Sequence, residues 1–195
     1  PHHTEEAEIL RGGMLLSYGL HNEAGKIFAK LIEQGASPSV RDRAWLYLAK
    51  IRYQRGYAAD AEDALAYIGT TLPPELEEER GLLQAQLLMA RADYAGAANV
   101  LNGMLGKTDG ERVCLRPLRD QPRQGFFSWI IGRKPAGPQW SGDACYVRYN
   151  LGIALIKSGD VARGTAMLDE LGRMPIPSTV KSAEEYRSLR DKANV

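Results

Sequence analysis

Three segments of this 195-residue chain align with one another without gaps. They cover residues 44–68, 80–104 and 147–171. In each segment, apolar residues recur at helical spacing around a small residue, a turn follows seven residues later, and a second helical pattern begins after the turn. Self-similarity at a period of roughly 20 to 50 residues is the signature of a repeat architecture. The sequence therefore predicts an array of helical hairpins.

Small residues set the register of these hairpins. In the first helices they are Gly12, Ala49, Ala85 and Gly152, and in the second helices they are Ala24, Ala61, Ala97 and Gly164. The series includes a fourth copy near the start of the chain, with its turn at residues 19–20. Small residues let two antiparallel helices approach closely. Prolines at positions 38, 73, 74, 175 and 177 are predicted to end or separate hairpins.

The second copy carries the most specific pattern. It combines Trp45, Leu48, Ala49, Gly56, Ala61, Leu65 and Pro73, and the last copy carries Leu151, Gly152, Leu155, Gly159 and Leu168 at corresponding places. In these residues the chain resembles the tetratricopeptide repeat family, over about residues 5–104 and 143–177. The chain departs from the pattern at Gly81 and Arg148, which stand where the second copy has Trp45, and at Gly164.

The resemblance implies an all-α fold, a right-handed superhelical solenoid of antiparallel helix pairs. Residues 1–104 are then expected to form three hairpins and residues 143–177 a fourth. Residues 105–142 would be a long irregular insertion before the last repeat, with basic and aromatic residues. Residues 178–195 would be a capping helix or the start of a further repeat, because residues 190–194 echo residues 41–45.

In this family, the first helices line a concave face that binds an extended peptide or a helix. Counting from the small residues, the candidates for partner contact on this face are Arg43, Lys50, Tyr53, Gln54, Glu79, Gln86, Met89, Tyr146, Tyr149 and Lys157, with Leu46, Leu82 and Ile153 beside them. Tyr and Arg combine a large contact area with a polar group, which favours their use at interfaces. For each of these residues, the alternative is a core position or ordinary surface.

The insertion at residues 105–142 carries a net charge of +4 and contains the apolar segment FFSWII. Its candidate partner-binding residues are Phe126, Phe127, Trp129 and Arg133. The segment is interpreted first as packing on the protein's own repeats. Three alternatives stay open: it lies in the groove, it binds a partner or a second copy of the chain, or it dips into a membrane surface.

The two cysteines, Cys114 and Cys145, do not have the spacing of a metal-binding knuckle. They are interpreted either as two buried thiols or as a disulfide. A disulfide would close a loop of roughly 30 residues and add on the order of 3–4 kcal/mol of stability in the chain-entropy model. It would also imply an oxidising compartment. A periplasmic location is favoured on this ground, with a cytoplasmic location as the alternative.

Composition and motifs argue against several classes of function. A net charge of +1 gives no strong field for nucleic acid, and no run approaches the 18 apolar residues of a transmembrane segment. The chain has no glycine-rich phosphate loop and no Gly-x-Ser-x-Gly motif. The acidic run at residues 75–79 is interpreted as a helix start. No enzymatic activity, cofactor or metal site is expected.

The expected function is therefore a non-catalytic scaffold or adaptor that mediates protein–protein interaction. Its partner would be another protein, a peptide or a second copy of the chain. One alternative is an assembly factor in a bacterial envelope, periplasmic or associated with the outer membrane. Another alternative is a regulatory domain of a longer enzyme.

Overall fold

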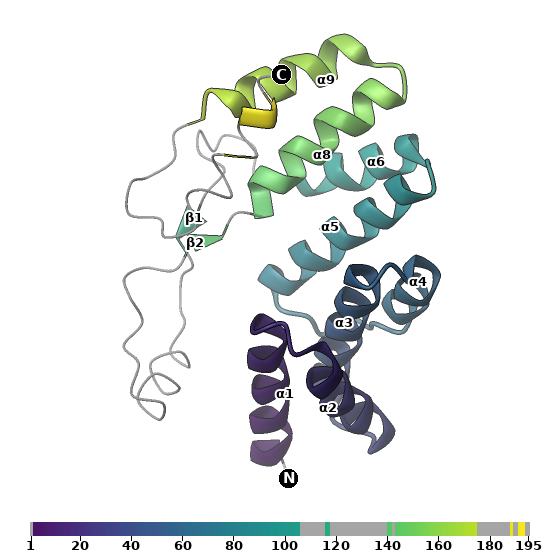
Figure 1. The fold of residues 1–195 in the computed structure, drawn as a ribbon, viewed down its shortest axis with the longest axis vertical. Coiled ribbons are helices and arrows are strands. Elements are labelled where there is room, and N and C mark those ends of the chain that lie inside the picture. Colours follow the sequence, from purple (N-terminus) through teal and green to yellow (C-terminus); the bar gives the residue numbers. More distant parts are fainter. Residues whose placement is uncertain are drawn as a thin grey trace. The chain divides into compact units, whose positions relative to one another are not determined.

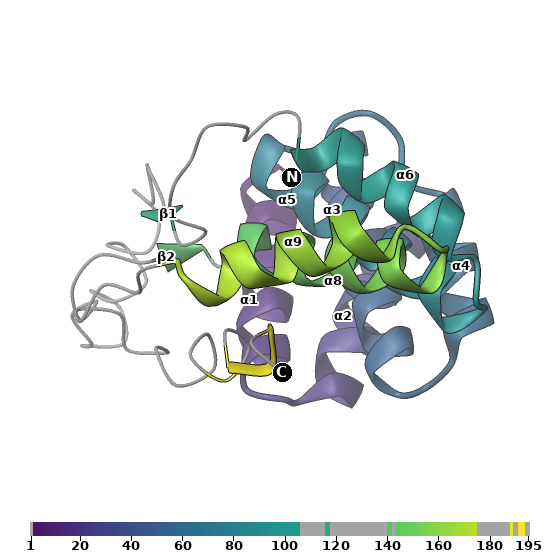
Figure 2. The same ribbon diagram turned by 90° about the horizontal axis from the view of Figure 1, so that it is seen from above.

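The computed structural model describes residues 2–105, 116–117, 140–141, 143–174, 188 and 191–193. The described residues are almost all α-helical (Figures 1 and 2). The chain divides into two compact units, Pro1–Asp93 and Tyr94–Val195. We call them unit 1 and unit 2 and describe each by itself. The division falls inside the third predicted hairpin, between its two helices.

Unit 1 contains five helices: α1 (His2–Ser17), α2 (His21–Glu33), α3 (Pro38–Gln54), α4 (Ala58–Ala66) and α5 (Pro74–Ala90). Among its described residues, unit 2 contains α6 (Tyr94–Leu105), α8 (Asp143–Lys157) and α9 (Val161–Gly172). Within the predicted insertion, β1 (Arg116–Pro117) pairs with β2 (Trp140–Ser141) in an antiparallel arrangement. The all-α prediction is confirmed, and the helical hairpins of both units are compatible with a helical repeat fold.

The four turns inside the predicted hairpins share one backbone geometry. The turn residues Gly19, Gly56, Ala92 and Gly159 all have a positive φ, at 76°, 85°, 63° and 108°. In each turn, the next residue donates its N–H to the carbonyl five residues back, as Tyr57 does to Arg52 at 2.8 Å. The turn residue itself donates to the carbonyl three residues back. These two hydrogen bonds define a Schellman motif, which ends a helix with a left-handed residue.

The start of the second helix repeats as closely as the turn. Leu20, Tyr57 and Asp160 occupy the same place and have φ and ψ angles of −83° and 68°, −94° and 68°, and −89° and 66°. The carbonyl of each accepts the first N–H of the helix that follows, four residues on. The sequence repeat is therefore also a repeat of backbone conformation.

Ala92 is the one described non-glycine residue with a positive φ. A left-handed conformation costs an L-residue about 1–2 kcal/mol because Cβ approaches the following carbonyl. We expect Ala92→Gly to raise the free energy of unfolding by about 1 kcal/mol, because it relieves this strain. The greater freedom of glycine in the unfolded chain offsets part of the gain. Urea titration followed by circular dichroism would measure the change.

Gly56→Ala provides the matched control. Gly56 holds the same turn position, and a Cβ there would meet no atom within 4 Å. We expect this substitution to lower stability by about 1 kcal/mol through backbone strain alone. A neutral or destabilising Ala92→Gly would show that the third turn tolerates alanine without strain.

The small residues lie where two helices approach, as predicted. A Cβ added at Gly12 would lie 2.5 Å from Cε1 of Phe28, and one added at Gly164 would lie 2.6 Å from the carbonyl oxygen of Gly152. Ala24, Ala49, Ala61, Ala85 and Ala97 are completely buried. Two apolar clusters form the core of unit 1, one around Phe28 and one around Leu46.

None of the described helices is long and apolar enough to cross a membrane.

Candidate functional site

Three first helices of unit 1 lie side by side: α1 contacts α3, and α3 contacts α5 (Figure 1). α1 and α3 run in the same direction, because the first turn of α1 meets the start of α3. Glu5 of α1 accepts a hydrogen bond from the backbone N–H of Ser37, just before α3, at 3.2 Å. We call the surface carrying Glu6, Arg43, Tyr47, Lys50 and Glu79 the first-helix face.

Two ion pairs cross this face from one hairpin to the next. Arg43 of α3 binds Glu6 of α1, with Nη2 2.5 Å from Oε1. Lys50 of α3 binds Glu79 of α5, with Nζ 3.2 Å from Oε2. These side chains are partly covered, and the Arg43 side chain is only 14% exposed. Partial burial and two bonded pairs give the face fixed polar groups without net charge.

Tyr47 lies between the two ion pairs. Its ring packs against Phe28, with the ring centroids 5.1 Å apart. Burial raises the pKa of the Tyr47 hydroxyl, the Glu79 carboxylate raises it further, and Arg43 partly opposes them. Tyr47 therefore stays protonated at neutral pH and keeps its hydroxyl donor.

The structure gathers Arg43, Lys50 and Glu79 on this face. Tyr53 is half-buried on α3 and packs against the Leu46 cluster, whereas Gln54 is exposed at the end of α3. Gln86 and Met89 are half-buried on α5.

The sequence-based placement was wrong for two leucines that stand beside these residues. Leu46 and Leu82 are buried, and Leu46 belongs to the core of unit 1. Helical spacing alone placed them toward the groove because both lie three residues before a small residue, at the boundary between groove and core.

The remaining candidates on the last hairpin lie in unit 2, on α8. Tyr146, Tyr149 and Ile153 are half-buried there. Lys157 is exposed at the end of α8 and lies over the ring of Tyr94 in α6, with Nζ 5.1 Å from the ring centroid. A lysine held over an aromatic face gains a cation–π interaction of about 0.5–1 kcal/mol at an exposed site.

The candidates in the insertion, Phe126, Phe127, Trp129 and Arg133, lie outside the described residues, as does Cys114. Cys145 is buried at the start of α8, 2% exposed, and is disulfide-bonded. The predicted pairing of Cys114 with Cys145 stays a prediction.

Sequence reasoning missed the role of Asp42. This residue of α3 is 6% exposed. Its carboxylate accepts hydrogen bonds from the N–H of Gly69 at 2.8 Å, the N–H of Thr71 at 3.1 Å and the hydroxyl of Thr71 at 2.6 Å. Gly69 and Thr71 belong to the link between α4 and α5. Asp42 therefore fastens the link that leads into the next hairpin.

The environment of Asp42 favours its charged form. Burial by itself raises the pKa of the carboxyl, but the hydrogen bonds from Thr71 and Gly69 and the nearby Arg80 guanidinium more than offset burial. The pKa of Asp42 therefore lies below its ordinary value. Glu5 occupies the same place in the first hairpin, seven residues before the small residue, and it also holds the following link. The shared position of these two acidic residues, seven residues before the small residue, could have revealed their role from the sequence.

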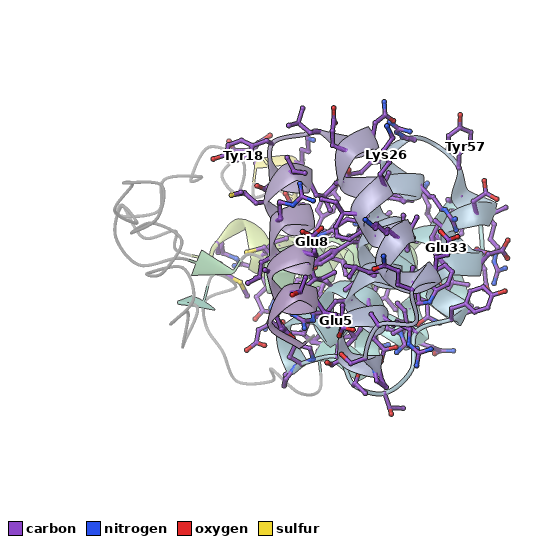
Figure 3. The ribbon with its side chains drawn as sticks, turned by 90° about the horizontal axis from the view of Figure 1, so that it is seen from below. Glu5, Glu8, Tyr18, Lys26, Glu33 and Tyr57 are labelled. Atoms are coloured by element: carbon purple, nitrogen blue, oxygen red, sulfur yellow. The ribbon has the colours of Figure 1, made fainter. Side chains whose placement is uncertain are left out.

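Within the described part of the chain, no group of three or more His, Cys, Asp or Glu side chains is arranged to hold a metal ion. The exposed aromatic residues of unit 1 include Tyr18 and Tyr57, at 60% and 59%. Figure 3 shows both at the outer edge of the unit, with Tyr57 pointing away from the helices.

No family model matches the chain, and no curated protein or solved structure matches it.

Proposed function

We propose that the protein is a non-catalytic scaffold of the tetratricopeptide type, which binds an extended segment of another protein along its first helices. The observation that carries the proposal is the first-helix face of unit 1. There, three consecutive first helices present polar and aromatic side chains on one surface, tied together by the Glu6–Arg43 and Lys50–Glu79 pairs.

The chemistry of this face suits a peptide backbone. An extended peptide has N–H and C=O groups that must find partners when it leaves water. Beside the face, Gln54 of α3 and Gln86 of α5 carry amides that both donate and accept hydrogen bonds, and the Tyr47 hydroxyl lies on the face itself. The charges on the face cancel in pairs, so shape and hydrogen bonding would select the partner rather than long-range attraction.

The right-handed superhelix and the concave shape of this face belong to the same proposal. They are supported by the shared turn geometry, since the hairpins that lie within one unit join their two helices by the same turn. The absence of enzymatic activity and cofactors is likewise proposed. Turnover by the purified protein that a single polar substitution abolishes would contradict it.

A pair of charge-matched variants tests the binding proposal. Arg43→Ala with Lys50→Ala removes two cations from the first-helix face, and Lys26→Ala with Lys30→Ala removes two exposed cations from α2. Pull-down from a native lysate, read by mass spectrometry, should show specific partners with wild-type protein and with the α2 variant. The face variant should lose them at least about tenfold, because it removes both ion pairs that fix the polar groups of the face and leaves two uncompensated negative charges there.

Circular dichroism would establish that both variants keep their helices. If a folded face variant captures the same partners as wild type, the first helices of unit 1 are not the binding surface.

A second candidate function is an envelope assembly factor. The disulfide at Cys145 favours it, because disulfides persist mainly in oxidising compartments. Mass spectrometry of protein from its source, alkylated without reduction, should find no free thiol. Alkylation of both cysteines would count against this candidate.

A further inference from the structure

A surface pocket of about 280 Å³ lies between α4 and α5 in unit 1, away from the residues of the first-helix face. Its lining consists of Glu62, Leu65, Ala66, Arg80, Gln84, Leu87, Leu88 and Arg91. Arg80, Gln84, Leu87 and Leu88 of α5, with Arg91 directly after the helix, follow helical spacing and lie along one side of it. The pocket is therefore a groove along α5 with α4 as its second wall.

The pocket has an apolar floor and a cationic rim. The apolar lining consists of half-buried Leu88 of α5 with the edges of Leu65 and Leu87, which are 9% and 2% exposed. Arg80 and Arg91 lie at its two ends along the helix; the carboxylate of Glu62 also lines the pocket, and Glu77, outside the lining, pairs with Arg80. Arg80 and Arg91 are eleven residues apart, which corresponds to about 16 Å along a helix axis. A ligand that matches this order has two anionic ends and an apolar middle.

Arg91 keeps donors for such a ligand. Nη1 of Arg91 lies 3.6 Å from Oε2 of Glu62, which is too long for a hydrogen bond, and the Arg91 side chain is 58% exposed. Nη1 of Arg80 donates hydrogen bonds to the carboxylate of Glu77 and to the carbonyl of Gly69, each at 3.2 Å. A guanidinium has five N–H donors in a planar fork that matches a carboxylate.

We propose that this pocket binds an extended segment of a partner protein in which two acidic residues flank an apolar one. In an extended strand, alternate side chains point to the same side, and four residues span about 13 Å. Acidic residues four positions apart, with a leucine midway between them, would bring both carboxylates within side-chain reach of Arg80 and Arg91. The leucine would lie on the floor formed by Leu65, Leu87 and Leu88.

The proposal goes beyond the first-helix face and does not depend on it. The probe is the peptide acetyl-Glu-Ser-Leu-Ser-Glu-amide, titrated to millimolar concentration into the full-length protein. Amide NMR spectra should show shifts at Leu65, Gln84 and Leu88, and no comparable shifts on α1. Replacing both peptide glutamates with glutamine, or the leucine with serine, should weaken binding about tenfold.

Two variants of the protein should change the affinity for the peptide in opposite directions. Arg91→Gln should weaken binding of the peptide about tenfold, because it removes a charge-assisted contact. Glu62→Gln should strengthen binding about threefold, because it removes the competing carboxylate. Arg11→Gln is the control: Arg11 is an exposed arginine on α1 that pairs with Glu8 and does not line the pocket.

Each outcome decides the proposal. Shifts confined to α4 and α5, lost with the glutamine peptide and in Arg91→Gln, support it. Absence of shifts at these helices overturns it, and so do shifts that persist unchanged in folded Arg91→Gln. Shifts on α1 and α3 alone would overturn the pocket while agreeing with binding at the first-helix face.

Discussion

Replacing Asp42 with alanine is expected to lower the free energy of unfolding by about 3 kcal/mol. The carboxylate is buried and accepts three hydrogen bonds from the link between α4 and α5. Hydrogen bonds to a charged group contribute about 1.5–3 kcal/mol, and those of one group do not add fully. Urea unfolding followed by circular dichroism at pH 7 would measure the loss.

The pH dependence separates the charge of Asp42 from its packing. The folded-state pKa of Asp42 lies below its value in the unfolded chain. The stability that the charge contributes is therefore fully present above the unfolded-state pKa, near about 3.9, and is lost as the pH falls through the lower folded-state pKa.

The matched variant is Asp42→Asn, which has nearly the same size and no charge. It should be less stable than wild type by about 2 kcal/mol at pH 7, and the difference should shrink as the pH falls below about 4. A difference that stays constant from pH 7 to below pH 3 would mean that the charge of Asp42 does not stabilise the link.

Replacing Gly164 with alanine is expected to cost about 2 kcal/mol in unit 2. The new Cβ would lie 2.6 Å from the carbonyl oxygen of Gly152 and 3.0 Å from the backbone nitrogen of Ile156. Backbone atoms cannot rotate away as the end of a side chain can, so α8 and α9 would have to separate. Overpacking typically costs about 1–3 kcal/mol, and the close backbone contacts place this site near the upper end of that range. Alanine regains about 1 kcal/mol because it favours the helix more than glycine does, which leaves a net loss of about 2 kcal/mol.

Gly103→Ala isolates the propensity contribution. Gly103 lies in α6, and a Cβ there would meet no atom within 4 Å. This variant should gain up to about 1 kcal/mol, less near the end of the helix. Thermal unfolding of both variants would show the contrast. A Gly164→Ala protein as stable as wild type would mean that the helices of the last hairpin are not in close contact at this position.

The hairpins could be predicted from the sequence because their determinants are local. A small residue and a turn seven residues later recur at fixed offsets, and the structure has a left-handed residue at all four of these turn positions. Ala92 shows how far this reasoning extends: the register predicted a turn there although alanine does not favour a positive φ. The packing of α8 on α6 could not be predicted in this way, because residues 105–142 between them follow no repeat.

The candidate site was predicted less completely because its contacts join distant residues. Arg43, Lys50 and Glu79 were identified from their register, but their ion-pair partners depend on how one hairpin is staggered against the next. That stagger depends on the links, and the links are held by Glu5 and Asp42. Both resemble ordinary surface acids until the hairpins are aligned. Arg148 is also buried, although an arginine ordinarily indicates a surface position; it stands where the second hairpin has Trp45.

Because the turns share one geometry, a whole hairpin can be duplicated and inserted as a unit. Residues 38–73 begin with a proline at the first position of α3, and α5 begins with Pro74 in the same way. A duplicate of residues 38–73 inserted before Pro74 would bring its own turn at Gly56 and its own Asp42 to hold the link after it. The array could then be lengthened by one hairpin without a new junction, and the first-helix face would gain one helix.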